Sequence, residues 1–359
     1  MSRTRALLSV VGLFAICLIV DIGLAIGRLD QTLSNVTPQT LLHTSDSYMQ
    51  HPYDGDINLS DHETLFIEDR EYNLTTKIIA EDYATIVVKN ARLTLSPSNS
   101  DGINFVLKGR SRLFVINSTI NFTRLPFGDC QIILQDEAEA NFTEAALAGW
   151  GYVVGRDASA VYVEKSNIGS GVATLHSPGV VSYGSSRLKV EDAKVDGVYV
   201  WENSTASIDR SDVGTVRTAW AESGRTAVNI TDSTVNTVET FVVFEQPAGT
   251  AIIRITNSTV EYAVYIHLNS TAWIENSSVA MVDATGNATV WLIESSVGQV
   301  SLEGNARVLL GWYLPLFGLV GVPYQLIPII QAASIMAIVI GLAAVSYAIW
   351  RRRREQIQR

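Results

Sequence analysis

A four-residue phrase that recurs ten times is the feature that most constrains what this chain can fold into. The phrase consists of a polar residue, then Ser or Ala, then a usually polar residue, and finally Val, Ile or Leu. Its copies end at Leu93, Ile120, Leu147, Ile168, Val195, Val213, Val235, Val260, Val279 and Val297. A recurring unit of this size predicts an elongated architecture in which each unit packs on its neighbours.

The spacing between copies varies, but the variation is confined to one part of the unit. Eight or nine residues before the Ser or Ala of each phrase there is a Gly, Asn or Asp, and these residue types tolerate the positive φ of a tight bend. The positions are Asp82, Gly109, Asp136, Asp157, Gly184, Asn203, Gly224, Gly249, Asn269 and Gly286. One arc of the unit therefore has a fixed length, and the other arc absorbs the variation.

Apolar residues alternate within the fixed arc, as they do in a strand with one buried face. In "NSTAWIENSSV" (269–279) the alternation continues through Ser277 and Val279, but its phase slips at Glu275 and Asn276, which indicates a two-residue turn. Strand, turn, strand and variable loop form one coil of a parallel β-helix. The sequence thus predicts an all-β fold of about ten coils, stacked about 4.8 Å apart.

The phrase and its turn resemble the coils of right-handed parallel β-helix proteins of the pectin-lyase-like superfamily, over residues 62–310. The version with many glycosylation signals and two flanking apolar segments is similar to uncharacterised archaeal cell-surface proteins. The resemblance implies a right-handed coil and an asparagine ladder at the turn, with amides that face inward and hydrogen-bond along the axis. The residues that would form this ladder are Asn90, Asn117, Asn257 and Asn276.

Apolar segments flank the predicted β-helix on both sides. Residues 1–27 begin with two arginines and an apolar run, which fits a cleaved signal peptide. An uncleaved signal anchor is the alternative, although Asp21 disfavours it because a carboxylate within a membrane costs up to roughly 3 kcal/mol. Residues 332–350 are uncharged and long enough to cross a bilayer as a helix. The arginines of the tail, 351–359, predict that this tail is cytoplasmic.

Two shorter segments complete the expected organisation. Residues 28–61 are polar and suit a linker or N-terminal cover, whereas residues 311–331 are apolar, contain three prolines and suit a cap near the bilayer. The β-helix would then lie outside the cell. Its one cysteine, Cys130, cannot form an internal disulfide, which favours a prokaryotic envelope. The formal net charge of −10 excludes nucleic acid as a partner.

Glycosylation signals are unusually frequent, since 12 of the 18 asparagines begin an Asn-x-Ser/Thr tripeptide and this excess needs a cause. One cause is glycosylation of an extracellular surface. The asparagine ladder is the other, and it is favoured for Asn117, Asn257 and Asn276. The signals expected to carry glycans are Asn73, Asn121, Asn141, Asn203, Asn229, Asn269 and Asn287.

Motifs for catalysis are weak in this sequence. The paired-carboxylate motifs of β-helix hydrolases are missing. Two lyase-like fragments, 124–129 and 187–189, are better explained as a loop and as the solvated face of a strand. We therefore expect neither enzymatic activity nor a cofactor.

Calcium binding is a minor alternative near the start of the β-helix. Asp54, Asp56 and Asn58 are spaced like the first ligands of a calcium loop. Leu59 stands where that loop needs glycine, and this favours a polar turn over a metal site.

Aromatic residues recur shortly after the phrase in several coils. They are Trp150, Tyr199, Trp201, Trp220, Phe241 and Tyr265. Aromatics at similar places in successive coils usually fill the core, and an internal stack is the favoured interpretation. If exposed, Tyr199, Trp201 and Trp220 would instead form a stripe that stacks on sugars.

These features predict a non-enzymatic, glycosylated, single-pass cell-surface protein with a structural or adhesive role in the envelope. Its expected partners are the membrane and envelope glycans or other surface proteins. The alternative is a membrane-tethered β-helix that binds or degrades polysaccharide.

Overall fold

The structure is a computed structural model, and it describes residues 56–96, 103–123, 130–169, 179–218, 224–240, 250–314 and 318–323. The chain divides into two units, Met1–His43 and Thr44–Arg359, and every described residue belongs to the second. The part so described contains strands and no helix, which confirms the all-β class for it.

The predicted signal or anchor (1–27) and the predicted membrane helix (332–350) lie outside the described residues. Within the residues that are described, no helix has the length and hydropathy needed to cross a membrane.

The strands form two long sheets, and every pairing is parallel except the last one. The 13-stranded sheet consists, in order, of β2 (Thr64–Glu68), β5 (Thr85–Lys89), β8 (Arg112–Ile116), β11 (Glu139–Thr143), β14 (Ala160–Glu164), β17 (Arg187–Glu191), β19 (Thr205–Asp209), β21 (Arg225–Thr231), β23 (Thr250–Thr256), β25 (Thr271–Glu275), β27 (Thr289–Ile293), β29 (Arg307–Leu314) and β30 (Gly318–Pro323). β30 pairs antiparallel with β29.

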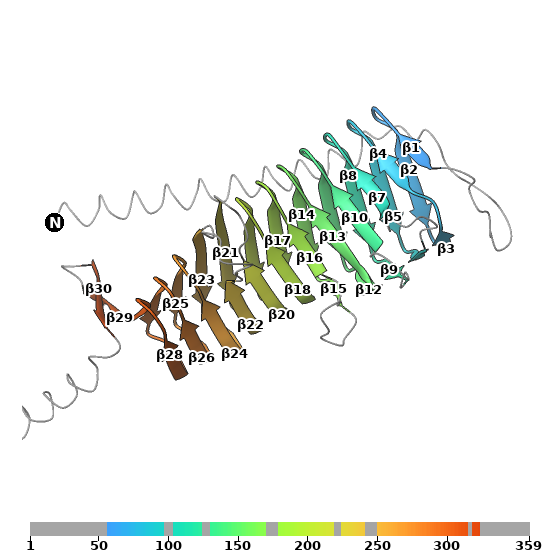
Figure 1. Cartoon of the computed structure of the whole chain (residues 1–359). Coiled ribbons are helices and arrows are strands. Elements are labelled where there is room, and N and C mark those ends of the chain that lie inside the picture. Colours follow the sequence, from blue (N-terminus) through green and yellow to red (C-terminus); the bar gives the residue numbers. More distant parts are fainter. Residues whose placement is uncertain are drawn as a thin grey trace, which may run out of the picture. The chain divides into compact units, whose positions relative to one another are not determined.

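The 17-stranded sheet lies on the other side of each coil (Figure 1). Its strands are β1 (Ile57–Leu59), β3 (Glu71–Leu74), β4 (Ile78–Ala80), β6 (Arg92–Leu95), β7 (Ile103–Leu107), β9 (Thr119–Phe122), β10 (Cys130–Leu134), β12 (Ala146–Gly149), β13 (Gly151–Gly155), β15 (Asn167–Ile168), β16 (Gly179–Ser182), β18 (Lys194–Val200), β20 (Asp212–Thr218), β22 (Thr234–Thr240), β24 (Thr259–Ile266), β26 (Ser278–Ala284) and β28 (Ser296–Leu302). Parallel strands stacked in register from coil to coil are the arrangement of a parallel β-helix, as the repeat predicts. The strands begin before residue 62 and continue past residue 310.

The variable arc differs between the two halves of the stack. In the N-terminal coils it is interrupted, and β15 and β16 are separate strands with a connection between them. Both of them pair with the single, longer strand β18 of the next coil. From β18 onward the two short strands are merged into one.

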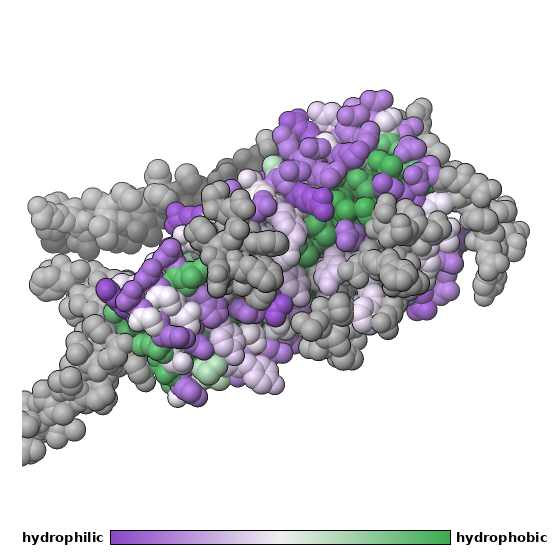
Figure 2. Space-filling model, viewed as in Figure 1, coloured by the Kyte–Doolittle hydropathy of each residue, from purple (hydrophilic) through white to green (hydrophobic). Residues whose placement is uncertain are grey.

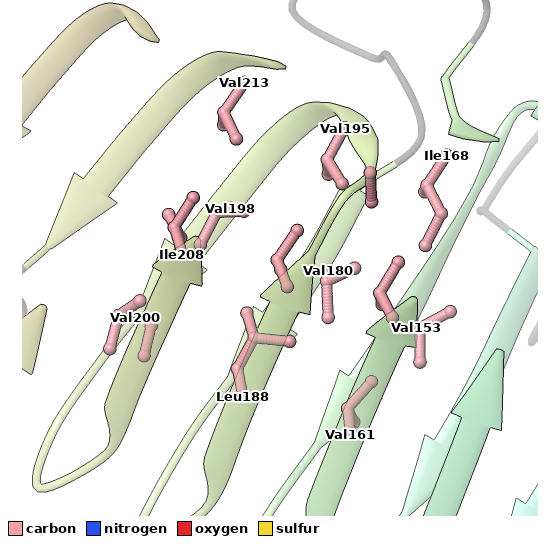
Figure 3. Close-up of a cluster of buried hydrophobic side chains, with 14 of the residues drawn as sticks. Val153, Val161, Ile168, Val180, Leu188, Val195, Val198, Val200, Ile208 and Val213 are labelled. Carbon is pink, nitrogen blue, oxygen red and sulfur yellow. The ribbon is translucent and has the colours of Figure 1, made fainter. Parts of the chain in front are cut away.

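The core is built from residues that occupy the same place in successive coils. One such row on the 17-stranded sheet consists of Val153, Val180, Val198, Val216, Val238, Val264 and Val282, all fully buried. Figure 3 shows Val153, Val180 and Val198 pointing into the coil toward residues of the facing sheet such as Val161 and Leu188. Each fully buried side chain of this size contributes roughly 1.5–3 kcal/mol of hydrophobic stabilisation, and the rows make that contribution continuous along the axis.

The corner between the two sheets lies at the recurring phrase. The first residue of all ten phrases has positive φ, and Asp69 (φ 56°) marks a further coil before them. The second residue points inward, and where it is serine its hydroxyl bonds the backbone. The Oγ of Ser258, for example, accepts a hydrogen bond from the amide nitrogen of Ser233 at 3.1 Å and donates one to the carbonyl oxygen of Thr256 at 2.7 Å. Where the next coil has serine, the buried amide of the corner is thereby hydrogen-bonded.

The opposite corner differs in detail from the sequence prediction. Gly184 and Gly286 have positive φ, as expected of turn-forming residues. At two other coils, however, the positive φ belongs to Glu202 (φ 60°) and Leu268 (φ 55°), one residue before the predicted Asn203 and Asn269. The inward Ser204 and Ser270 fix the register of these turns, and residue type alone did not locate the bend.

Candidate functional site

A row of outward-facing residues runs along the 17-stranded sheet. Strand register places Val106, Ile133, Val154, Val181 and Tyr199 side by side in successive coils. The row continues through Arg217, Glu239, Tyr265 and Asp283. Side chains alternate between the two faces of a strand, and these residues point away from the core. The outer face is therefore apolar in its N-terminal half and polar in its C-terminal half.

The apolar half forms a hydrophobic cluster separate from the core, which we call the outer patch. It consists of the buried Ile133, Val154 and Val181 and the partly buried Ile103, Tyr152, Tyr183, Tyr199 and Trp201. Figure 2 shows a hydrophobic band on the face that carries β4, β7, β10 and β13, next to a hydrophilic ridge. Ile133, Val154 and Val181 are only 5–6% exposed, so the accessible surface of the patch belongs to its partly buried members. Apolar surface exposed on the outside of a fold can mark a binding site.

Two glycines make room for the phenol ring of Tyr199. The ring of Tyr199 lies over Gly197 of its own strand and over Gly179 of the neighbouring strand. A Cβ added at Gly179 would be 3.0 Å from Cε2 of Tyr199, which is tighter than ordinary packing. Gly197 is required by the close approach of the Tyr199 ring. At Gly179 a Cβ would also be 2.8 Å from the carbonyl oxygen of Gly197, and neither glycine has positive φ.

Three aromatic rings meet at the C-terminal end of the patch. The rings of Tyr183 and Trp201 are 4.4 Å apart between centroids at 84°, and those of Tyr199 and Trp201 are 6.4 Å apart at 71°. These edge-to-face contacts hold the rings in fixed orientations. Burial raises the pKa of both phenols, Tyr183 and Tyr199, so each remains a neutral hydrogen-bond donor at physiological pH.

Charged groups lie at the rim of the aromatic cluster. Arg156 and Glu202 are close enough to Tyr183 to act on the pKa of its phenol in opposite directions, Arg156 lowering it and Glu202 raising it. Arg217 forms an ion pair with Glu239 at 2.9 Å, next in the row after Tyr199. The patch thus combines an apolar floor, half-exposed rings and polar groups at its edge.

The favoured interpretation of the aromatics as an internal stack is wrong for Tyr199 and Trp201. Val198 and Val200 take the inward positions of β18, and alternation turns Tyr199 outward. Trp201 also joins the outer patch. Trp220 and Phe241 lie outside the described residues. Residue type alone does not show whether these aromatics lie inside or outside, because valines at the alternate positions suffice to fill the coil.

The asparagines at the phrase form hydrogen-bonded pairs along the axis. Nδ2 of Asn117 donates to Oδ1 of Asn90 at 2.9 Å, and Nδ2 of Asn276 donates to Oδ1 of Asn257 at 2.7 Å. The four side chains are exposed, and the expectation that they face inward is therefore wrong. The positive-φ bend turns the asparagine outward, and the following Ser or Ala takes the inward place.

A second asparagine stack occupies the opposite corner. Nδ2 of Asn287 donates to Oδ1 of Asn269 at 3.1 Å, and Nδ2 of Asn305 donates to Oδ1 of Asn287 at 3.2 Å. Asn269 and Asn287 are exposed, as expected of glycan sites, but sequence analysis missed that they stack. The signal was present, because these three asparagines recur at intervals of 18 residues.

The other glycosylation candidates are spread over the surface. Oδ1 of Asn203 accepts a hydrogen bond from the amide nitrogen of Arg225 at 3.1 Å. Asn73 and Asn229 are exposed, and Asn121 and Asn141 are half-buried.

The residues proposed for calcium are not brought together as ligands. Asp54 lies outside the described residues, Asn58 is exposed in β1, and Oδ1 of Asp56 accepts a hydrogen bond from the amide nitrogen of Lys77 at 3.3 Å. No group of three or more His, Cys, Asp or Glu side chains capable of holding a metal ion occurs among the residues that the structure describes.

A second set of outward aromatics escaped the sequence analysis. Trp273 and Trp291 are register partners on the 13-stranded sheet, and the guanidinium of Arg254 lies 5.5 Å from the ring centroid of Trp273. Each tryptophan stands three residues before the first residue of the recurring phrase, Asn276 or Glu294. This shared spacing could have identified the pair from the sequence.

Comparisons with protein-family models, with curated proteins and with solved structures gave no match for this chain.

Proposed function

We propose that this chain is a non-enzymatic, membrane-anchored adhesive protein of the cell surface, and that its outer patch binds glycan chains. The observation that carries the proposal is the outward position of Tyr183, Tyr199 and Trp201 over an aliphatic floor. The apolar faces of sugar rings stack on such aromatic rings, and the phenol and indole groups add directional hydrogen bonds.

The anchoring part of the proposal rests on the ends of the chain. Residues 332–350 would span the membrane, the tail 351–359 would be cytoplasmic, and the β-helix would be outside. The exposed asparagines of the glycosylation signals and the buried Cys130, the one cysteine of residues 62–310, support an extracellular, prokaryotic setting such as an archaeal envelope.

The fold can also be stated more finely as a proposal. Connections between parallel strands of one sheet are right-handed in about 98% of cases, and we infer a right-handed coil of the pectin-lyase-like type. Fold alone carries no activity, and the proposed function rests on the outer patch.

Affinity for polysaccharides tests the proposal. Full-length protein in detergent would be passed through gels or resins that contain neutral and acidic polysaccharides, and retardation would be measured for the wild type and for Trp201→Ala. We expect the variant to bind about 10-fold more weakly, equivalent to about 1.4 kcal/mol.

Tyr262→Ala serves as the matched control, because Tyr262 is 67% exposed and does not belong to the outer patch. Its affinity should equal that of the wild type. Absence of retardation on every polysaccharide would contradict glycan binding, and release of new reducing ends would contradict the non-enzymatic assignment.

A further inference from the structure

A graded row of side chains lies at the C-terminal end of the 13-stranded sheet, on its outer face. Strand register places Arg254, Trp273, Trp291 and Leu309 side by side in β23, β25, β27 and β29. Arg254 is exposed and the other three are partly exposed. We call these four residues the tryptophan face. They run from cationic through aromatic to aliphatic as the chain approaches its C-terminus.

The charge of this face differs from that of three earlier strands of the same sheet. The outward residues of its four strands include Arg254, Arg307 and a single acid, Glu275. In the strands β14, β17 and β19 the outward residues include three acids, Glu164, Glu191 and Asp209, and two cations, Arg187 and Lys189. A protein of net charge −10 thus presents one face on which cations outnumber acids.

The aromatic and cationic groups of the face act as one unit. The guanidinium of Arg254 is 5.5 Å from the ring centroid of Trp273, within the range of a cation–π contact. Both tryptophans project from strands whose alternate side chains, Ala272, Ile274, Val290 and Leu292, are buried in the core. The indoles therefore cannot turn inward and remain available on the surface.

The position of the face relative to the chain end indicates what it meets. β30, the strand that pairs with β29, ends at Pro323, and residues 324–331 separate it from the membrane helix of the proposed function. Eight residues span at most about 29 Å. If that helix crosses the membrane, the tryptophan face is, after β30 itself, the part of the 13-stranded sheet held nearest to the bilayer.

We infer that the tryptophan face rests on the outer surface of the lipid bilayer. Tryptophan is enriched at the membrane–water interface, where its ring lies among the headgroups. Leu309 would contact the edge of the hydrocarbon region, and Arg254 would bind headgroup phosphates through charge-assisted hydrogen bonds. The inference rests on the membrane anchoring in the proposed function and adds a second, non-covalently held contact to it.

Quenching of tryptophan fluorescence by lipid tests the inference. The full chain would be reconstituted into phosphatidylcholine and phosphatidylglycerol vesicles with and without brominated acyl chains. The quenched fraction of the fluorescence would be compared for the wild type, Trp273→Phe and Trp291→Phe. We expect the fraction to fall in both variants, because each removes a lipid-accessible indole. A fraction that is unchanged or higher in both variants would overturn the inference.

Trp201→Phe is the control, because it removes an indole of the outer patch on the other sheet and should not lower the quenched fraction. Flotation with the vesicles separates the two proposals. A chain that fails to float contradicts the membrane anchoring and this inference with it, whereas a chain that floats without the expected loss of quenching contradicts this inference alone.

Discussion

The phenol ring of Tyr199 lies against the backbone of Gly197, so closely that a Cβ on the glycine would be 2.8 Å from Cε2 of the ring. The same ring also covers Gly179 in the adjacent strand. The ring can lie this close to the sheet because Gly179 and Gly197 have no side chains. This contact couples a backbone position to the orientation of a proposed ligand-binding ring.

Replacing Gly197 tests that coupling. We expect Gly197→Ala to lower the free energy of unfolding by about 1–3 kcal/mol, because the new methyl group and the ring cannot occupy the same space. Chemical denaturation followed by intrinsic fluorescence measures the loss. In a Tyr199→Ala background the same substitution should cost clearly less, and equal costs in the two backgrounds would show that the ring is not the obstacle.

The inward serines of the corner make a second prediction. Ser258→Ala removes the acceptor for the buried amide nitrogen of Ser233 and should destabilise the protein by about 1–3 kcal/mol. Ser278→Ala is the control, since Ser278 is exposed and its hydroxyl accepts only from the Oγ of Ser296 at 3.3 Å. A shift of the denaturation midpoint that is the same for both variants would argue against the buried hydrogen bond as the cause.

Asn276 combines a strained backbone with a side-chain contact, and two substitutions separate them. Its φ is 47°, and its Nδ2 is 2.7 Å from Oδ1 of Asn257. Asn276→Ala loses the contact and retains the positive φ, and should cost about 1–2 kcal/mol. Asn276→Gly loses the contact but removes the conformational penalty. The glycine variant should therefore melt at a higher temperature than the alanine variant, and the reverse order would exclude backbone strain at this bend.

The ion pairs that Arg210 forms with Glu191 and Asp192 should make the stability of the fold depend on pH. Hydrogen bonds from Lys189 and Arg210 lower the pKa of the Glu191 carboxyl, and a hydrogen bond from Arg210 lowers the pKa of Asp192. A carboxyl whose pKa is lower in the folded state stabilises the fold above its unfolded pKa, about 4 for both residues, and loses this effect as the pH falls through the folded value.

The measurement is the melting temperature of Arg210→Gln and wild type between pH 7 and pH 2. The wild type should be the more stable at pH 7, and the difference should disappear in acid. Arg187→Gln removes another exposed cation and serves as the comparison. If the difference between Arg210→Gln and wild type persists at pH 2, the carboxylates are not its source. The side chains of Arg210, Asp192 and Glu191 are 47%, 39% and 27% exposed, and salt should also reduce the effect.

The coil itself could be predicted from the sequence because its determinants are local and repeated. The phase slip at Asn276 marks the corner, and the alternation around it places Ser277 and Val279 in the core, where the structure has them. Each coil repeats this pattern, and errors at one coil are corrected by the others.

The outer surface could not be predicted in the same way. Valines alone fill the coil at β18, and nothing local states whether Tyr199 lies inside or outside. The bend at Leu268 is set by the turn that ends at Ser270, and it overrides the usual preference for Asn or Gly at positive φ. Both features depend on how neighbouring coils stack, which the residue types of a single coil do not encode.

Serines from different coils make the same contacts at the corner. This equivalence implies that the β-helix can lose or gain one complete coil at a time. Ser258 and Ser277 are 19 residues apart and bond equivalent backbone atoms. Removing residues 258–276 would join Asn257 to Ser277, which could then accept from Ser233 as Ser258 does now. The distance along the β-helix axis from Tyr199 to the last coil would then shorten by one strand spacing, about 4.8 Å. Evolution or protein engineering could thus change the distance between the outer patch and the C-terminal end of the β-helix while leaving the residues of the patch unchanged.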